Sequence, residues 1–475
     1  MPRTLIVWFR QDLRLDDNPA LQAALADAER IIPIYIHDDT PAWSPGAASR
    51  WWLHHSLTAL AEKLKQLGSR LIVRHGGNIE ALQQLIDETG ADAVYCNRVY
   101  EPARLNRDKQ LHRQLKENGI TFSIYPGNLL REPDTVLNLG GKPYKVFTPF
   151  YQCYLREGWD NHTYKVPEQL PGVSSRIKSE KIAALELLPT IGWDSGFYDQ
   201  WQPGETGAWK QLRRFLRNSL SDYHQARDVP SLEGSSRLSP HLHFGEISVR
   251  AILGELDRQN RRRQAEPFIR ELIWRDFAHS VLFHFPHTTD KPFDERFNRF
   301  KWKTSKKLLQ AWQQGQTGYP IVDAGMRELW HTGTMHNRVR MIVASFLTKN
   351  GMIHWKQGAQ WFWDTLVDAD LAANSMNWQW VAGCGVDAAP WFRIFNPVTQ
   401  SRKFDKEGLY IRQWVPELTK LPNKYIHEPW KAADEIQQQA GCIIGRDYPA
   451  PFLDLKATRE AALEAYKLQL KDKNQ

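Results

Sequence analysis

The 475-residue sequence is poor in cysteine and has no long apolar segment. Its 4 cysteines, Cys96, Cys153, Cys384 and Cys442, lie far apart and form no CxxC pair, so the sequence indicates neither a zinc ribbon nor a disulfide framework. No run of about 18 apolar residues occurs, and the first apolar stretch ends at Arg10, so we expect neither a membrane span nor a signal peptide. These absences predict buried, reduced thiols in a cytoplasmic protein.

Common catalytic and nucleotide-binding motifs are also missing. After the first expected strand the sequence runs Arg10-Gln11-Asp12-Leu13-Arg14, without the glycines of a dinucleotide-binding turn. The motifs HExxH, GxxxxGK[ST] and GxSxG are absent, and the pair of His241 and His243 has no third metal ligand nearby. The sequence therefore argues against a hydrolase, a metalloenzyme and a nicotinamide-dependent enzyme.

The charge balance and the tryptophan content are the first positive signals. Lys and Arg number 62 against 54 for Asp and Glu, a formal net charge of +8, which favours a polyanion as partner. The shares of hydrophobic (42%) and charged (24%) residues are ordinary for a globular chain, which excludes disorder along the whole length. The 20 tryptophans equal the 20 phenylalanines, which indicates a specific use for indole rings.

Apolar periodicity divides the chain into three parts. Residues 1–130 alternate short apolar strands with amphipathic helices, which predicts a doubly wound α/β domain around a parallel sheet. Residues 131–204 are rich in proline and glycine and are interpreted as an interdomain connector, whereas helical windows dominate residues 205–475 and predict an all-α domain. The expected strands are Leu5–Phe9, Ile31–Ile36, Leu71–Arg74, Ala93–Cys96 and Thr121–Tyr125.

Two helical segments place unusual side chains on one face through spacings of three and four residues. A surface ion pair beside a half-buried Trp explains the first set taken alone. A face that combines a cation, an amide and a thioether is nevertheless odd for a plain core stripe. The first set is Glu271, Trp274 and Arg275, and the second is Asn337, Arg340 and Met341.

The segment from Asp368 to Trp380 concentrates polar and indole side chains. Asp370 and Asn374 are one helical turn apart, whereas Trp378 and Trp380, if helical, point in nearly opposite directions. Solvated carboxylates and tryptophans packed in the core would explain any one of these features. They explain less well why this segment occurs in the same chain as the two helical segments described above.

A third feature is the run of small and hydroxyl residues from Glu233 to Pro240, which precedes a short helical window. Backbone N–H groups and hydroxyls in such a run suit a bound phosphate. A surface turn with a helix cap is the alternative.

These segments closely resemble the DNA photolyase and cryptochrome family over nearly the whole chain. The resemblance implies an N-terminal α/β domain and a C-terminal helical domain that binds FAD, in agreement with the periodicity. The matching motifs are Val7–Asn18, Tyr144–Phe150, Glu233–Ser239, Thr317–Ala324, Met335–Arg338, Trp378–Trp380 and Phe392–Pro397.

The resemblance implies a deoxyribodipyrimidine photolyase, which uses light and reduced FAD to split cyclobutane pyrimidine dimers in UV-damaged DNA. The lesion must leave the duplex to approach the flavin. Phosphate contacts then account for the basic charge balance. A monomer suits docking on DNA.

Site residues follow from the resemblance by position. Asn374 would face flavin N5, where an amide can hydrogen-bond the anionic reduced flavin and so favours repair, whereas Asp would favour a neutral radical form. The implied FAD contacts are Tyr223, Ser235, Ser236, Arg237, Leu238, Ser239, Glu271, Arg275, Asn337, Arg340, Asp368, Asp370 and Asn374.

Further roles follow in the same way. Glu271, Asn337 and Met341 resemble the lesion-pocket residues, with Trp274 and Trp380 stacking on the dimer, each indole contributing roughly 1 to 3 kcal/mol. Arg227 and Arg338 would contact backbone phosphates, and Trp274 and Trp380 would complete the DNA-binding set by stacking. The implied electron-transfer tryptophans are Trp302, Trp355 and Trp378.

The sequence departs from the familiar bacterial enzymes in two ways. Thr334 and Ser375-Met376-Asn377 replace commoner residues of the family and suggest a subgroup related to plant cryptochromes. Ala103, Arg104, Thr288 and Thr289 stand where those enzymes hold a folate antenna. A methenyltetrahydrofolate bound differently, a deazaflavin, and the lack of any antenna are therefore all open.

Three alternative functions remain. A cryptochrome-like blue-light photoreceptor is disfavoured by Asn374, Glu271 and Met341. Repair of the (6-4) photoproduct implies a pair of active-site histidines, whereas this pocket offers Asn337 and Met341. A non-catalytic single-strand binder would need neither the face formed by the Asp368 segment nor the tryptophan relay.

Overall fold

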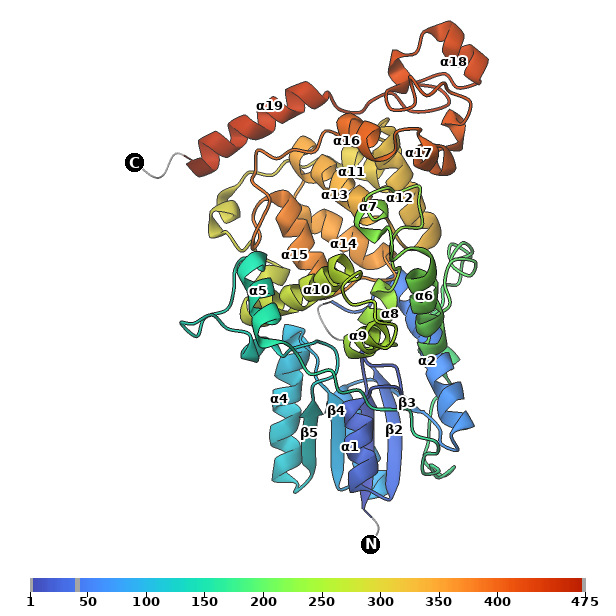
Figure 1. The fold of residues 1–475 in the computed structure, drawn as a ribbon, viewed down its shortest axis with the longest axis vertical. Helices are drawn as coiled ribbons and strands as arrows, with labels where there is room; N and C mark the ends of the chain where they lie inside the picture. The colour runs from blue at the N-terminus through green and yellow to red at the C-terminus, as the bar shows by residue number, and fades with distance from the viewer. Residues whose placement is uncertain (1–2, 39–42, 472–475) are drawn as a thin grey trace.

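The computed structural model describes residues 3–38 and 43–471. An α/β domain occupies one end of the elongated molecule and a helical domain the other (Figure 1). The N-terminus lies at the far end of the α/β domain, and the C-terminal helices lie at the opposite end. The predicted fold class, a doubly wound parallel sheet followed by an all-α domain, is confirmed.

The sheet of the α/β domain has five parallel strands in the order β3-β2-β1-β4-β5. Strand β1 is central, so Leu5 pairs with Ile31 on one side and with Ala93 on the other. All five strands were predicted, because buried parallel strands are short continuous apolar runs. Their bounds are β1 Thr4–Phe9, β2 Arg30–His37, β3 Ile72–His75, β4 Ala93–Asn97 and β5 Thr121–Tyr125.

Helices cover both faces of this sheet. Leu5 and Val7 point into a core shared with α1 and α2, whereas Ile6 and Trp8 point into a second core shared with α3 and α4. This alternation follows from the two-residue period of a strand. The helices are α1 Pro19–Asp27, α2 Ala47–Gln66, α3 Asn78–Thr89 and α4 Pro102–Glu117.

The segment from 131 to 204 is mostly irregular but contains one helix that periodicity did not reveal, α5 (Phe147–Glu157). Phe147, Phe150 and Tyr154 of this helix are buried in a core with α6, α9 and α10 of the helical domain. Pro149 sits in its first turn, where proline is tolerated, and so it does not interrupt the helix. This part of the segment therefore belongs to the packing of the helical domain.

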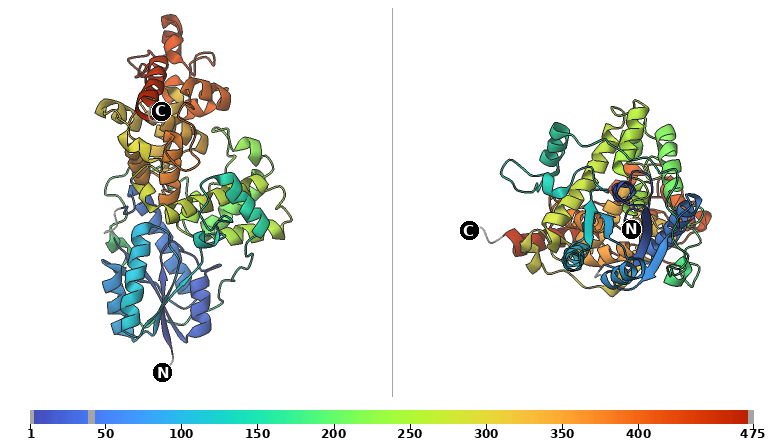
Figure 2. Two further views of the ribbon diagram at one scale, coloured as in Figure 1. Left: turned by 90° about the vertical axis from the view of Figure 1, so that its left-hand side faces the viewer. Right: turned by 90° about the horizontal axis from the view of Figure 1, so that it is seen from below.

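The helical domain is built around two cores, and Figure 2 shows its helices stacked above the sheet end of the molecule. The helices are α6 Glu205–Asn218, α7 Tyr223–Ala226, α8 Ser239–His243, α9 Val249–Arg258, α10 Glu266–His284, α11 Lys306–Gln313, α12 Pro320–Thr332, α13 Asn337–Ser345, α14 Trp355–Thr365, α15 Leu371–Ala382, α16 Pro397–Phe404, α17 Leu409–Trp414, α18 Asp434–Ala440 and α19 Leu455–Tyr466. Helix α15 is buried on most of its circumference, which explains why it lacks an amphipathic pattern.

Two absences bear on the sequence predictions. In residues 3–38 and 43–471, no helix is long and apolar enough to cross a membrane. The same residues contain no cluster of His, Cys, Asp and Glu suited to a metal ion. The 4 cysteines are buried and unpaired, as predicted.

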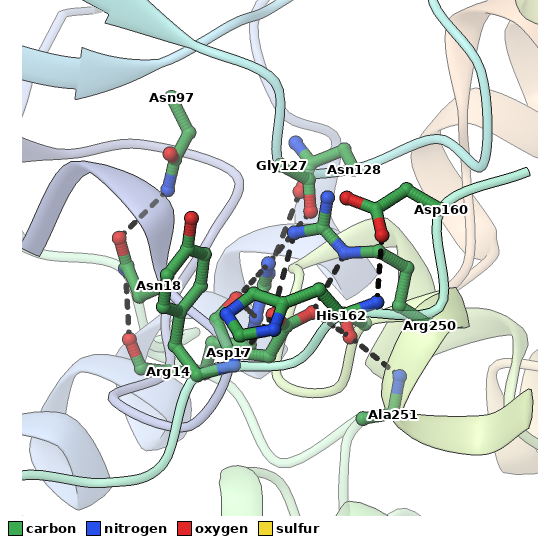
Figure 3. A network of polar contacts seen from close by, with 12 residues as sticks. Arg14, Asp17, Asn18, Asn97, Gly127, Asn128, Asp160, His162, Arg250 and Ala251 are labelled. Atoms are coloured by element: carbon green, nitrogen blue, oxygen red, sulfur yellow. Dashed lines mark hydrogen bonds and ion pairs between the residues drawn. The ribbon is translucent and has the colours of Figure 1, made fainter. Parts of the chain in front are cut away.

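A buried polar network joins the two domains (Figure 3). Arg14, in the loop between β1 and α1, donates hydrogen bonds to the carbonyl oxygens of Gly127 at 2.6 Å and Gly245 at 2.9 Å. The carboxylate of Asp17, 0% exposed, accepts from Ser248 Oγ at 2.5 Å and from Arg250 Nε at 3.1 Å. Each domain thus supplies the partners that the other domain's buried charges need.

Gly245 allows this close approach. Its φ of +64° lies in the left-handed region, and a β-carbon there would lie 2.1 Å from the carbonyl oxygen of Gln11. A side chain at position 245 would therefore push the helical domain away from the loop that carries Arg14.

The network predicts that Asp17→Asn destabilises the protein. Asn tolerates the positive φ of Asp17, so the variant removes the charge without adding backbone strain. Breaking one side of a buried ion pair costs about 3 kcal/mol, so we expect the free energy of unfolding to fall by about that amount. Denaturant unfolding of Asp17→Asn and of the exposed control Asp199→Asn measures this, and equal stability of the two variants would contradict it.

Candidate functional site

Asp368 is the centre of the first polar cluster in the helical domain. Arg340 Nη2, from α13, lies 3.0 and 3.1 Å from its two carboxylate oxygens, and Ser239 Oγ, from α8, lies 2.6 Å from Oδ2. The Asp368 side chain is only 5% exposed, against 26% for Arg340. Three residues that are far apart in the sequence therefore form one anchored group beside the N-terminus of α15.

Asp370 forms a second anchor two residues later. It caps α15 by accepting from the backbone N–H of Ala373 at 2.8 Å. Its Oδ2 also lies 3.4 Å from His243 Nδ1 and 3.5 Å from His279 Nε2. Burial alone would raise the pKa of Asp370, but these two histidines outweigh it and lower the pKa, so the carboxyl group stays ionised.

Arg275 is held close by through backbone contacts. Its guanidinium donates to the carbonyl oxygens of Asn128 at 2.7 Å and Leu242 at 3.3 Å. Arg275 therefore connects α10 to the end of the α/β domain and to α8.

Asn374 lies one turn into α15 and is buried. Its Nδ2 donates to the carbonyl oxygen of Ala359 in α14 at 3.0 Å. This bond fixes the orientation of the amide and leaves its Oδ1 as a hydrogen-bond acceptor.

The loop from Glu233 to Ser239 has the exposed hydroxyls and close packing that a phosphate site needs. Ser235 and Ser239 are exposed, whereas Leu238 is buried and anchors the loop. A β-carbon at Gly234 would lie 2.4 Å from the backbone of Ala226, so the loop lies directly against α7. Arg237 adopts a φ of +52° and places its guanidinium over the ring of Trp201, 4.4 Å from the centroid.

Tyr223, the first residue of α7, is buried against Phe215 and Phe268. Burial raises the pKa of its hydroxyl well above the usual value. Its phenol therefore stays neutral and keeps its proton for donation.

Two ion pairs link the segment after α7 to α10 and α13. Arg227 Nη1 lies 2.7 Å from Glu271 Oε1, and Arg338 Nη2 lies 2.7 Å from Asp228 Oδ1. The neighbouring residues Arg227 and Asp228 thus carry opposite charges and reach different helices. The pair of Arg338 and Asp228 was not anticipated, because a contact between residues 110 positions apart leaves no local pattern.

The indoles of Trp274 and Trp380 are both half-buried. One face of Trp274 is stacked on Phe147 of α5, with ring centroids 3.5 Å apart and planes at 8°. Trp380 packs against the same core of the helical domain that contains Trp378. Met341 and Asn337 are on α13, where Met341 Sδ lies 3.8 Å from Arg338 Nη1 and Asn337 is exposed in the first turn.

The three tryptophans that the resemblance assigns to electron transfer lie between the core and the surface. Trp378 and Trp355 are 3% and 1% exposed, and Trp302 is half-buried. The His354 ring contacts both Trp302, at 5.2 Å, and Trp355, at 5.5 Å between centroids. A β-carbon at Gly358 in α14 would lie 2.1 Å from the ring of Trp378, so the missing side chain provides the space for that indole.

A cavity of about 220 Å³ lies between the two domains. Trp8 and the Ala103 and Arg104 positions line it from the α/β domain, and Thr289 and Trp363 line it from the helical domain. Thr288 is buried next to it and donates a hydrogen bond from Oγ1 to the Phe285 carbonyl oxygen at 2.8 Å. Most of the positions at which the sequence departs from the folate-binding enzymes therefore face one aromatic-lined cavity.

Comparison with known families agrees with this architecture. A model described as DNA photolyase matches residues 5–170, and one described as the FAD binding domain of DNA photolyase matches residues 268–468. The chain is 47% identical to a deoxyribodipyrimidine photo-lyase of Agrobacterium fabrum over 97% of both chains. The chain belongs to the DNA photolyase and cryptochrome family.

Structural similarity gives the same result. The crystal structure of a bacterial class III photolyase from Agrobacterium tumefaciens matches with a TM-score of 0.95 and 46% identity, covering 99% of this chain and 98% of that one. Cryptochrome-2 of Arabidopsis thaliana is 37% identical over 98% of this chain and 79% of its own length. The predicted similarity to deoxyribodipyrimidine photo-lyases is confirmed, with cryptochromes more distant.

The structure also adds residues that the sequence did not single out. His243 and His279 contact Asp370, whereas the sequence shows His243 only as half of a pair with His241 that lacks a third metal ligand. Its partner in that pair, His241, contacts Glu246 through Nδ1 in the core, consistent with a structural role. The sequence could not indicate that Asp370 has two histidine neighbours, because these contacts form only when helices distant in the sequence pack together.

The Asp368 cluster predicts that Arg340→Gln weakens FAD retention. The substitution leaves a nearly buried carboxylate without its cation, which destabilises the folded FAD site. We expect roughly a tenfold loss of FAD affinity, measured by dissociation of the flavin and recovery of its fluorescence. The surface pair of Arg296 and Asp294 supplies the control Arg296→Gln, and equal flavin loss from both variants would refute a role for the cluster.

Proposed function

We propose that this protein is a deoxyribodipyrimidine photo-lyase that splits cyclobutane pyrimidine dimers in UV-damaged DNA. The observation that carries the proposal is 47% identity to a photo-lyase of Agrobacterium fabrum over 97% of each chain. The polar clusters around Asp368 and Glu271 support it. FAD, when bound, supplies the electron that opens the cyclobutane ring and receives it back, so the reaction has no net redox change.

The chemistry of the residues around Asp368 fits FAD. The hydroxyl of Ser235 is exposed and can donate to phosphate or ribityl oxygens, whereas Ser239 Oγ donates to Asp368 and can accept from a ribityl hydroxyl. Arg340 is oriented by Asp368 and can donate from its remaining N–H groups. Asn374 keeps its Oδ1 as an acceptor facing away from Ala359, which suits an N–H of the reduced flavin. The remaining members of the proposed site are Tyr223, Ser236, Arg237, Leu238, Glu271, Arg275, Asn337, Asp368 and Asp370.

The lesion would be held by Glu271, Asn337 and Met341 between the indoles of Trp274 and Trp380. Glu271 is 32% exposed and ion-paired to Arg227, and its carboxylate oxygens can accept from a base N–H. Phe147 supports one face of Trp274 and leaves the indole rigid, which reduces the entropy lost when a base stacks on it.

Arg227 and Arg338 would contact backbone phosphates of the damaged strand. Both are within reach of solvent, with side chains 26% and 19% exposed. These contacts carry no sequence information, which suits an enzyme that must act wherever a dimer occurs. We propose that the protein acts on DNA as a monomer.

Trp378, Trp355 and Trp302 would pass electrons from the surface to oxidised FAD and so return it to its active state. Trp378 and Trp355 are buried and Trp302 is half-buried, which supports the assignment of Trp302 to the surface end of the relay. Gly358 positions the Trp378 ring directly against α14, the helix that Trp355 begins.

The proposal predicts that Glu271→Gln lowers the rate of dimer repair more than it lowers the affinity for FAD. Replacing a hydrogen bond to a charged group removes about 1.5 to 3 kcal/mol, so we expect the rate of light-dependent repair to fall roughly 10- to 100-fold. The assay follows recovery of base absorbance in an oligonucleotide that carries a thymine dimer, with reduced protein and a dark sample.

Glu295→Gln, at an exposed position, is the control variant. Light-driven reduction of FAD in the wild-type protein without any repair of the dimer would refute the photo-lyase proposal and favour a cryptochrome-like photoreceptor. Repair of a (6-4) photoproduct alone would assign the protein to that other enzyme class.

A second proposal concerns the cavity between the domains, which would hold a light-harvesting antenna chromophore. Trp8, Trp43 and Trp363 line it and offer indole surface for a flat ring system. Arg104 and Arg107 line it too and offer positive charge for an acidic ligand. A methenyltetrahydrofolate and a deazaflavin both meet these requirements.

Ala103→Phe tests the antenna proposal, because the new ring would enter the cavity from an exposed helix position. We expect the variant to lose the added chromophore and the excitation band that it contributes to repair, with direct excitation of FAD unchanged. Titration with each chromophore separately distinguishes the two. Equal chromophore binding by Ala103→Phe and by the control Ala183→Phe would place the antenna elsewhere.

A further inference from the structure

Two ion pairs lie beside the proposed lesion pocket, and they differ in the role of the carboxylate that each arginine contacts. Arg227 is paired with Glu271, a residue of the proposed lesion pocket. Arg338 is paired with Asp228, to which the sequence and the proposed reaction assign no role. The Asp228 side chain is 40% exposed and that of Arg338 19%, so the pair lies at the protein surface with its cation turned inward.

Arg338 keeps most of its hydrogen-bonding capacity unused. Its Nη2 donates to Asp228 Oδ1, and its Nη1 reaches only the weak acceptor Met341 Sδ, at 3.8 Å. Its Nε is buried and has no hydrogen-bond partner among the described residues. Leaving a buried donor unpaired is costly, so this guanidinium would gain from a ligand with more acceptor oxygens.

The position of the Arg338 guanidinium is nevertheless fixed. It lies over the ring of Phe404 in α16, 4.4 Å from the centroid. A cation held in place by an aromatic ring loses little freedom when its anion is exchanged. A phosphate diester can accept two hydrogen bonds from one guanidinium, whereas Asp228 contributes a single short contact.

We propose that Asp228 is an internal competitor of DNA: its carboxylate occupies on Arg338 the place that a backbone phosphate takes when DNA binds. This inference rests on the proposed function, in which Arg338 contacts the DNA backbone. DNA must displace Asp228 to reach Arg338, and the displaced carboxylate remains near the phosphate. Asp228 therefore weakens backbone binding and limits how long the enzyme stays on undamaged DNA.

The competition acts on any DNA, because phosphates are the same at damaged and undamaged sites.

The pair of Arg227 and Glu271 behaves differently. When a phosphate binds Arg227, Glu271 loses its cation, and the base of an extruded dimer can become its new partner. Asp228 thus sets the strength of binding, whereas Glu271 links binding to the lesion.

Asp228→Asn removes the competing charge while it keeps the size of the side chain. We expect the FAD-loaded variant to bind an undamaged duplex about fivefold more tightly than the wild type. The slope of log Kobs against log salt concentration should become steeper by up to about 1, because binding of a phosphate to Arg338 no longer frees a carboxylate that recruits a cation. Fluorescence anisotropy at several salt concentrations measures both quantities.

Asp222→Asn is the matched control. It makes the same change of charge next to α7, and Asp222 is exposed and its side chain accepts no capping hydrogen bond from that helix. Asp228→Glu should restore weaker binding, since it keeps a carboxylate within reach of Arg338. In an Arg338→Gln background, Asp228→Asn should have no more effect than Asp222→Asn.

Equal affinities of Asp228→Asn and Asp222→Asn for undamaged DNA would overturn the inference. A gain that persists in the Arg338→Gln background would overturn it as well, because Asp228 would then act through general repulsion. Retention of FAD and an unchanged unfolding midpoint show that each variant is folded. Dimer repair by the wild type, measured on the same preparation, tests the proposed function separately, so either idea can fail alone.

Discussion

The buried carboxylate of Asp17 is the constraint on which the arrangement of the two domains depends. It is fully enclosed and negatively charged, so it requires Ser248 and Arg250 of the helical domain to remain in contact with it. Arg14 imposes the opposite requirement through its bonds to Gly127 and Gly245. Charges of both signs are buried at one junction, so separating the domains would leave both charges without their partners. The need to keep these partners in contact therefore fixes the orientation of the domains.

The same rule, that each enclosed charge has a partner from a distant part of the chain, organises the helical domain. Arg340 and Ser239 meet at Asp368, and His243 and His279 meet at Asp370. These contacts fix α8, α10 and α13 around the start of α15. At the proposed DNA-facing side the rule is relaxed: Arg338 has a partner but is left with unpaired donors. These unused donors lie where the proposed function places a DNA phosphate.

Much of this could be predicted from the sequence, and the remainder has identifiable physical reasons. The five strands of the sheet and helices such as α10 follow from local periodicity, which is a property of neighbouring residues. Helix α15 could not be found in that way, because it is buried on most of its circumference and its apolar residues do not gather on one face. Motif resemblance singled out Arg338 and Glu271, but nothing in the sequence relates Arg338 to Asp228 or Trp274 to Phe147. Such pairs arise only when helices distant in sequence pack together.

The cavity between the domains has a thermodynamic consequence. Its walls come from both domains, with Arg104 on one side and Thr289 and Trp363 on the other. A molecule that binds there contacts both walls at once, so its binding free energy is linked to the docking of one domain on the other. Such a ligand stabilises the docked state by an amount that grows with the logarithm of its concentration. An occupant of this cavity would therefore act as a removable part of the domain interface. The free energy that holds the two domains together would be larger when the cavity is filled than when it is empty.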